Sequence, residues 1–311
     1  MFMRRNAHHI KKRYLCAALI AAHIFTVKQK ECIMALVTMK QLVDEAWEKG
    51  TCIPAFNVGS LEMVRGALRA AEELEVPVII QIAERLLKYS PLELIGPGMV
   101  EAARESKLPV AVNFDHSSTY DVIKKALDLG FTSVMYDGST LPFEENIEGT
   151  RRIVELANEY GASVEGELGL VGGSEDGLSD HGILCTNPDK AREFCERTGI
   201  ACLAVAIGNA HGDYPTAPVL AFDILEQINQ KAGVPLVLHG GSGISDEDFR
   251  KAISLGIAKI NIGTASFNNV TKFASDYLAT EGKHTYFELN TAMTQGMYEN
   301  ALRHIKVFRG L

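Results

Sequence analysis

The chain has 311 residues, of which 47% are hydrophobic and 23% are charged. One α/β domain can be that long, and the sequence lacks a run of about twenty apolar residues that would span a bilayer. Residues 1–33 hold seven Lys or Arg and one acidic residue, a balance of about +6, so the rest of the chain carries about −14 of the total of −8. This acidic body argues against nucleic acid and membrane as partners.

Six cysteines lie at irregular spacings with no CxxC pair, which favours reduced thiols in the cytoplasm over disulfides or a thiolate zinc site. The basic, then apolar, start resembles a signal peptide, but no A-x-A-like cleavage site precedes Lys28. Met34 opens a helix-like segment, MALVTMKQLVDEAWEKG. We predict that residues 1–33 are an extension outside the fold, with Met34 as the true start. The alternatives are a membrane-surface or targeting segment and a structured addition.

From residue 39 onward, short apolar or β-branched runs alternate with amphipathic stretches, the pattern of parallel strands joined by helices. We predict eight strands, at residues 52–57, 78–82, 110–114, 133–137, 163–168, 202–207, 236–239 and 259–262. Eight such strands predict an α/β fold of the (β/α)8 TIM-barrel type, formed as a single domain by residues 34–311.

Helices are expected at residues 61–74, 120–129, 147–160 and 246–255, and glycines 130, 161 and 256 follow the last three. Proline stands just before three of the predicted strands. A glycine-rich, acidic stretch, residues 169–188, interrupts this pattern after the fifth strand. Long loops inside compact domains are usually functional, so we predict that it is a mobile lid.

Three histidines follow separate predicted strands at the same end: His116 in NFDHSS, His211 in GNAHGD and His239 in LVLHGG. One such histidine is most often structural, whereas three suggest neutral imidazoles converging on one cation. Three nitrogen ligands leave a fourth position open, which is the arrangement of a catalytic zinc site. His181, in the long loop, is left undecided.

Glycine-rich segments follow the last strands of the predicted barrel, where backbone N–H groups and a helix N-terminus favour an anion. Alone, HGGSG could be a tight turn; beside a candidate metal ligand, phosphate binding is the better interpretation. The candidate phosphate and substrate residues are Gly212, Gly240, Gly241, Ser242, Asn261, Gly263 and Thr264.

Asp115, next to His116, is placed for proton transfer, although it could instead orient a histidine. Glu175 in the long loop is a candidate base or a solvated charge, and Asp176 competes with it.

The segments PAFN, FDH, VMYDGS, VEGELGLVGGSEDG, AVAIGNAHG, LVLHGGSG and KINIGT occur in the order and at the spacing of one family. The chain resembles the class II, metal-dependent ketose-bisphosphate aldolases, which act on fructose or tagatose bisphosphates. The resemblance runs from about Met34 to near the C-terminus.

The resemblance implies reversible cleavage of a ketose 1-phosphate or 1,6-bisphosphate to dihydroxyacetone phosphate and an aldehyde, through a zinc-stabilised enediolate. It implies that His116, His211 and His239 hold Zn²⁺, that Asp115 moves the proton of the C4 hydroxyl, and that Glu175 is the base at C3. It further implies an alternative or second cation site at Asp137 and Glu167, a substrate contact at Asn57, and a homodimer or homotetramer.

Several positions depart from the family pattern. Leu289 stands about where an arginine would contact the second phosphate, Ala83 replaces a serine, and Gly263 replaces an acidic residue. We therefore expect an aldehyde partner that need not be phosphorylated. Arg85 or Arg309, from the same or a neighbouring subunit, could supply the positive charge that would otherwise be missing at the second phosphate.

The same residues leave three alternative functions to consider. A Schiff-base aldolase needs a lysine near the carboxyl end of a strand, and Lys259 begins its strand instead. A non-catalytic subunit that supports a tagatose-bisphosphate aldolase complex could dispense with the histidines, yet all three are present. A barrel metal hydrolase would leave the phosphate-type loops unexplained.

Overall fold

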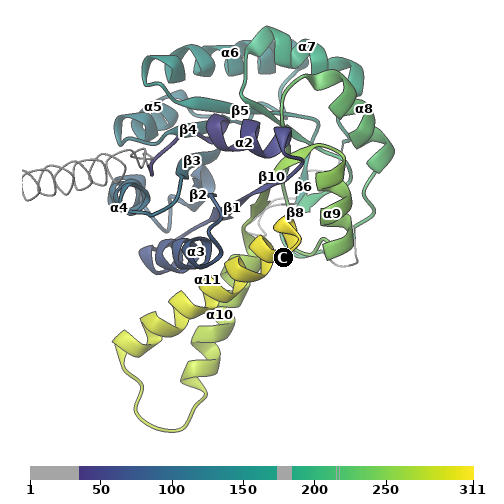
Figure 1. Cartoon of the computed structure of the whole chain (residues 1–311). Coiled ribbons are helices and arrows are strands. Elements are labelled where there is room, and N and C mark those ends of the chain that lie inside the picture. The colour runs from purple at the N-terminus through teal and green to yellow at the C-terminus, as the bar shows by residue number, and fades with distance from the viewer. Residues whose placement is uncertain (1–34, 174–183, 215, 217) are drawn as a thin grey trace, which may run out of the picture. The chain divides into compact units, whose positions relative to one another are not determined.

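A computed structural model describes residues 35–173, 184–214, 216 and 218–311. Within these residues, eight parallel strands close into a barrel in the order β1-β10-β9-β7-β5-β4-β3-β2 (Figure 1). The barrel strands are β1 (Ile53–Asn57), β2 (Val78–Ala83), β3 (Val110–Ser117), β4 (Ser133–Tyr136), β5 (Ser163–Leu168), β7 (Cys202–Val205), β9 (Leu236–Leu238) and β10 (Ile257–Ile262). The predicted TIM barrel is confirmed.

Strands β4, β7 and β9 end earlier than predicted, and Asn209 explains the ends of β7 and β9. Its side-chain Oδ1 accepts a hydrogen bond from Ile207 N at 2.7 Å, and its Nδ2 donates to His239 O at 3.0 Å. The amide thus replaces ladder partners at the ends of β7 and β9. His239 therefore lies just beyond its strand, free of the sheet.

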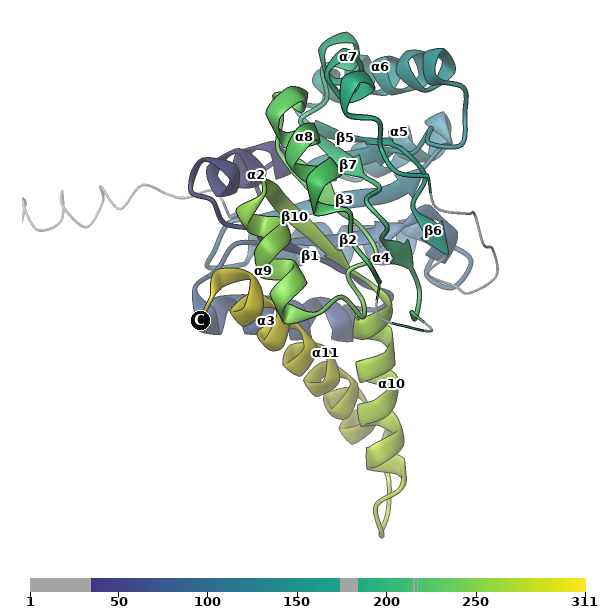
Figure 2. The same cartoon turned by 90° about the vertical axis from the view of Figure 1, so that its right-hand side faces the viewer.

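Helices surround the barrel, with at least one after every barrel strand (Figure 2). They are α3 (Leu61–Leu74), η1 (Glu84–Leu86), α4 (Leu92–Arg104), α5 (Tyr120–Asp128), α6 (Phe143–Glu159), α7 (Pro188–Thr198), α8 (Phe222–Ala232), α9 (Asp246–Ser254), α10 (Thr264–Leu278) and α11 (Tyr286–Arg309). Gly199, Gly233 and Gly310 end their helices in the left-handed region, as glycine allows.

The helix α2 (Met39–Glu48) closes the amino-terminal end of the barrel. Its N-cap Thr38 forms a capping box with Gln41, and Met39 N donates to Ser133 Oγ, at the start of β4, at 2.8 Å. The buried side chains Leu42 and Val43 pack on the residues inside the barrel. The functional end must therefore be the opposite one.

The core has two parts. Inside the barrel, small side chains such as Ala55, Ala111 and Ala204 meet α2, and a larger cluster lies between the strands and the outer helices. Large buried residues of this outer cluster include Phe56, Phe114 and Phe249. This packing holds the strand ends, and the side chains on them, in a fixed frame.

Two features add to the predicted elements. Beyond β5 and β7, the short strands β6 (Gly172–Gly173) and β8 (Ala210–His211) pair with each other. The helices α10 and α11 pack side by side, α11 lies along α3, and the far end of the pair extends beyond the barrel in both views (Figures 1 and 2).

Candidate active site

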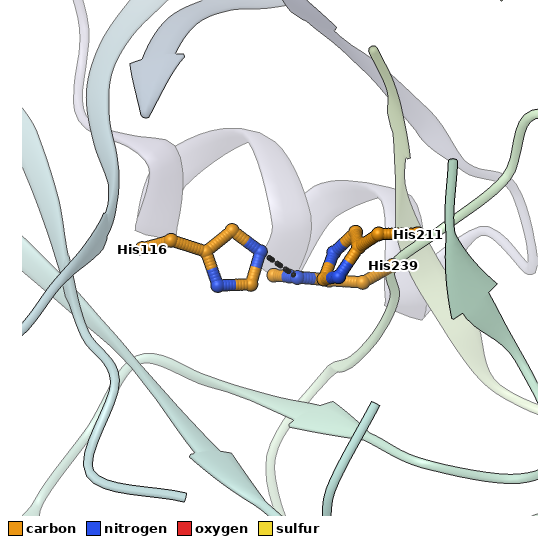
Figure 3. A group of neighbouring side chains, drawn as sticks. All are labelled: His116, His211 and His239. Atoms are coloured by element: carbon orange, nitrogen blue, oxygen red, sulfur yellow. Dashed lines mark hydrogen bonds between the residues drawn. The ribbon is translucent and has the colours of Figure 1, made fainter. Parts of the chain in front are cut away.

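The three histidines meet at the carboxyl end of the barrel (Figure 3). His116 Nε2 lies 2.7 Å from His239 Nδ1, and the ligand atoms of all three rings lie within 4.8 Å of one another. The ring centroids of His116 are 4.7 Å from His211 and 4.5 Å from His239. The structure thus brings His116 together with two histidines that lie 95 and 123 positions further along the chain.

A strained backbone aims His116 at the other rings. Its φ is 45°, in the left-handed region, and the β3–β4 register shifts between Phe114 and Ser117. A bulge of this kind re-aims a side chain, and strain in a non-glycine residue persists only where its surroundings enforce it. Glu84 contributes to that enforcement, because its carboxylate accepts hydrogen bonds from Ser117 Oγ at 2.6 Å and Ser118 N at 3.2 Å.

His211 is held by the β6–β8 pair and by a tyrosine. Gly173 pairs with His211, and a Cβ on Gly173 would lie 2.2 Å from His211 O, so glycine is required there. Ala210 N donates to Tyr214 Oη at 2.7 Å, and Tyr214 Oη donates to Gly240 O at 2.9 Å. Tyr214 therefore joins the loops that carry His211 and His239.

Carboxylates lie behind the histidines. Asp137 Oδ2 is 2.9 Å from His116 Nδ1, and Glu165 Oε1 is 2.7 Å from His239 Nε2. Lys259 Nζ donates to the other oxygen of Glu165 at 2.7 Å, and both of these side chains are fully buried. Such partners fix the orientation of a ring and leave its other nitrogen for a ligand.

The electrostatics favour a positive charge between these groups. Burial, followed by the nearby His116, lowers the pKa values of His211 and His239, which keeps both rings neutral. Burial also opposes charge on His116, but Asp115 and the hydrogen-bonded Asp137 raise its pKa to about 9. The carboxylates that stabilise a proton on His116 would equally stabilise a metal cation beside it.

The buried side-chain atoms that lack a hydrogen-bond partner among the described residues include His211 Nε2 and Glu167 Oε2. Glu167 Oε2 lies 3.9 Å from His116 Nδ1 and 3.8 Å from His239 Nδ1. Orphaned buried polar atoms are rare and need an explanation. Three imidazoles with an unsatisfied nitrogen fit a catalytic zinc ion, and the group His116, Asp137 and Glu167 offers a second set of ligand atoms.

Asp115 is the end of a row of buried amides. Asn113 Nδ2 donates to Gln81 Oε1 at 3.1 Å, Gln81 Nε2 donates to Asn57 Oδ1 at 2.9 Å, and Asn57 Nδ2 donates to Asp115 Oδ2 at 2.9 Å. Asn261 Nδ2 donates to Asp115 Oδ1 at 3.3 Å. Burial alone would raise the pKa of Asp115, but the neighbouring positive groups and the Asn57 amide lower it, so the carboxylate stays ionised.

The glycine-rich loops lie beside the histidines. Gly240 has a φ of 62°, and a Cβ on it would lie 2.0 Å from Ala210 O, so the tight approach of the two loops requires glycine. Ser242 Oγ accepts from Ala265 N at 2.8 Å, in the first turn of α10. Among the remaining candidate residues, Gly212 follows β8, Gly241 lies in the loop after β9, and Asn261 lies in β10. Gly263 and Thr264 lie at the start of α10.

Arg85 and Arg309, the two candidates for binding a second phosphate, lie in different parts of the structure. Arg85 lines a cavity of about 230 Å³ together with His116 and His211. Arg309 Nη1 donates to Thr51 Oγ1, at the amino-terminal end of β1, so within its own chain it cannot reach the site. Leu289 lies in the first turn of α11, and α11 begins at the far end of the α10–α11 pair (Figure 1). Glu175, Asp176 and His181 lie outside the described residues.

Sequence reasoning did not assign roles to Glu165, Lys259, Glu84 or Tyr214. The first two carry a signal, because alternate residues of a barrel strand point to the same side, so Glu165 and Lys259 share the inside with Glu167 and Asn261. Burial lowers the pKa of Lys259, but Glu165 raises it above its ordinary value. A lysine held charged is unsuited to form a Schiff base.

The barrel, with histidines, an aspartate and glycine-rich loops on its carboxyl rim, has the architecture of a TIM-barrel enzyme. Residues 37–310 match the family model described as fructose-bisphosphate aldolase class-II. The chain belongs to this family, and it is accordingly an aldolase, a carbon–carbon lyase.

Similar proteins agree with this assignment. The chain is 43% identical over 251 residues to a probable fructose-bisphosphate aldolase of Bacillus subtilis, covering 80% of this chain and 88% of that protein. A fructose-bisphosphate aldolase of Geobacillus stearothermophilus is 42% identical over the same length and the same shares. The solved YdjI aldolase of Escherichia coli K12 has a TM-score of 0.78 and 36% identity, covering 88% of this chain and 97% of that one.

Proposed function

We propose that the chain is a zinc-dependent aldolase that reversibly cleaves a ketose 1-phosphate, or a ketose 1,6-bisphosphate, to dihydroxyacetone phosphate and an aldehyde. The observation that carries this proposal is the convergence of His116, His211 and His239, with an unsatisfied buried nitrogen on His211. A divalent ion held by these rings supplies a Lewis acid that stabilises negative charge on the substrate oxygens.

In this proposal Asp115 takes the proton of the hydroxyl on C4 during cleavage and returns it during condensation. Two amides hold its carboxylate, and its lowered pKa keeps it in the form that accepts a proton. Glu175, on the family resemblance, moves the proton at C3 from the long loop. Closure of that loop, a lid, would exclude water from the reacting carbon.

The loops after β8, β9 and β10 hold the phosphate in this proposal, through backbone N–H groups near the start of α10. The proposed phosphate and substrate residues of these loops are Gly212, Gly240, Gly241, Ser242, Asn261, Gly263 and Thr264. Asn57 contacts the substrate in this proposal, and its amide also donates a hydrogen bond to Asp115. Asp137 and Glu167 provide the alternative or second cation site.

The family and the composition are the basis for proposing a cellular location and an oligomeric state. Among the described residues, no helix is both long and apolar enough to cross a membrane. We propose a cytoplasmic homodimer or homotetramer.

Proton exchange tests the function without knowledge of the aldehyde. The zinc-loaded protein should exchange a C3 proton of dihydroxyacetone phosphate with deuterated water, lose this activity on chelation and regain it on adding zinc. Retro-aldol assays on fructose and tagatose bisphosphates and on ketose 1-phosphates then identify the substrate. A protein with no bound metal and no exchange would instead be the non-catalytic supporting subunit.

A further inference from the structure

The barrel order places the two halves of the cleft opposite each other. The glycine-rich loops follow β8, β9 and β10, whereas Arg85, Ser118 and Ser139 follow β2, β3 and β4. In the closed order of eight strands, β3 is four strands from β9 in either direction, so it faces β9 across the barrel. His116 belongs to β3, whereas His211 and His239 belong to β8 and the loop after β9, so the three rings come from both sides. Figure 3 shows the rings facing one another.

This geometry fixes the direction of a substrate. If the phosphate of dihydroxyacetone phosphate lies in the loops after β9 and β10, its reacting carbon lies at the histidines. The aldehyde must then extend towards the ends of β2, β3 and β4. The side chains that line the cavity on that side include Arg85, Ser118, Ser139 and Thr140, a guanidinium and three hydroxyls.

Arg85 is anchored on the side of the cavity formed by the ends of β2, β3 and β4. It belongs to the short helix η1, directly after β2, and it is half-buried. Its neighbour Glu84 is bonded to Ser117 and Ser118 on β3 and just beyond it. The positive charge of Arg85 also lies close enough to His211 to oppose protonation of that ring, after the larger effects of burial and His116.

If the aldehyde is acidic, its binding on this side of the cavity requires a positively charged side chain. Asp137 lines the same cavity, and its carboxylate would repel an anion. At the far end of the α10–α11 pair, Leu289 offers no charge. A guanidinium binds carboxylates and phosphates through paired hydrogen bonds, and these are stronger than hydrogen bonds between neutral groups.

We propose that Arg85 is a specificity-determining residue that binds an acidic group, a carboxylate or a phosphate, on the aldehyde, while Ser118, Ser139 and Thr140 face the hydroxyls between that group and the reacting carbon. This inference rests on the proposed aldolase function.

Three aldehydes of equal carbon number test it: glyceraldehyde, which is neutral, glyceraldehyde 3-phosphate, and tartronate semialdehyde, which carries a carboxylate. Each is condensed with dihydroxyacetone phosphate by the zinc-loaded wild type, Arg85→Ala and Arg85→Lys. Arg65→Ala, which changes an exposed arginine on α3, is the matched control. Melting temperature and zinc content are measured for each variant.

We expect the wild type to prefer one acidic aldehyde over glyceraldehyde, and the preferred one identifies the acidic group. Arg85→Ala should lower that preference in kcat/KM by about 10- to 100-fold, mainly through KM, as expected for a lost charge-assisted hydrogen bond. Arg85→Lys should recover part of it, and Arg65→Ala should keep it.

Equal losses for neutral and acidic aldehydes in Arg85→Ala would overturn the inference, as would a loss of zinc with an unchanged preference. Exchange of the C3 proton of dihydroxyacetone phosphate distinguishes failure of the Arg85 role from failure of the aldolase function. A wild type that exchanges this proton without preferring an acidic aldehyde contradicts only the role of Arg85. A wild type that does not exchange it contradicts the aldolase function as well.

Discussion

The buried pair of Lys259 and Glu165 leads to a quantitative prediction. Lys259→Met removes the ammonium while keeping most of the side-chain volume, and it leaves the Glu165 carboxylate buried with only His239 and the weak thiol donor of Cys202 among the described residues. Breaking a buried ion pair in this way costs about 3–5 kcal/mol of the free energy of unfolding. We expect the lower end of this range, about 3 kcal/mol, because His239 Nε2 remains as a donor at 2.7 Å.

The assay is urea unfolding of the metal-free protein, followed by circular dichroism, for each single variant and for the double variant Glu165→Gln/Lys259→Met. At an m-value of about 3 kcal/mol/M, the loss in Lys259→Met shifts the midpoint by about 1 M. The double variant leaves no unpaired charge and should recover at least about 2 kcal/mol relative to the sum of the single effects. Lys272→Met, at an exposed pair with Asp276, should change stability by less than about 1 kcal/mol.

The same pair should also tune metal binding. Glu165→Gln weakens the acceptor that orients His239, so zinc affinity should fall by about 10- to 100-fold in competition with a chromophoric chelator. Additive effects of the two substitutions on stability, together with unchanged zinc affinity, would refute the view that the pair acts as one unit behind His239.

Three other perturbations have expected outcomes. Gln81→Leu interrupts the amide row that holds Asp115, so kcat should fall by about tenfold or more in a retro-aldol assay with little change in KM; an unchanged kcat would contradict the role of the row. Gly240→Ala forces a Cβ against Ala210 O, and calorimetry should show a loss of about 2 kcal/mol or more; wild-type stability would contradict that packing. Burial lowers the pKa of His304 to about 4, against about 6.5 in the unfolded chain, so its neutral form stabilises the fold above pH 6.5, and this contribution is lost as the pH falls towards 4. His304→Gln should therefore lose about 2 kcal/mol less than the wild type between pH 7 and pH 5 in urea titrations, and equal losses would contradict this.

The strand pattern was sufficient to predict the barrel, because buried parallel strands and amphipathic helices each leave a periodic signal. It also placed His116, His211 and His239 at one rim, since the carboxyl ends of parallel strands share one side of the barrel. Asp115, by contrast, was predicted without its partners. The two amides that hold it belong to Asn57 on β1 and Asn261 on β10, and spacing along one strand does not reveal side-chain contacts across the barrel.

Other parts of the site had weaker sequence signals. The β6–β8 pair has only two residues in each strand, too few for a periodic pattern. The left-handed backbone of His116 depends on a bulge that is defined by pairing with β4, a contact between distant segments. Tyr214 is an unremarkable loop tyrosine until Gly240 is brought beside it.

The central claim is that three imidazoles hold the catalytic ion. X-ray absorption at the zinc K-edge of the zinc-loaded protein, with one ion per chain, tests it directly. The claim predicts nitrogen ligands at about 2.0–2.1 Å with imidazole scattering, and loss of that scattering from one ring in His211→Ala. A shell with sulfur at about 2.3 Å, or one that is unchanged in His211→Ala, would contradict it.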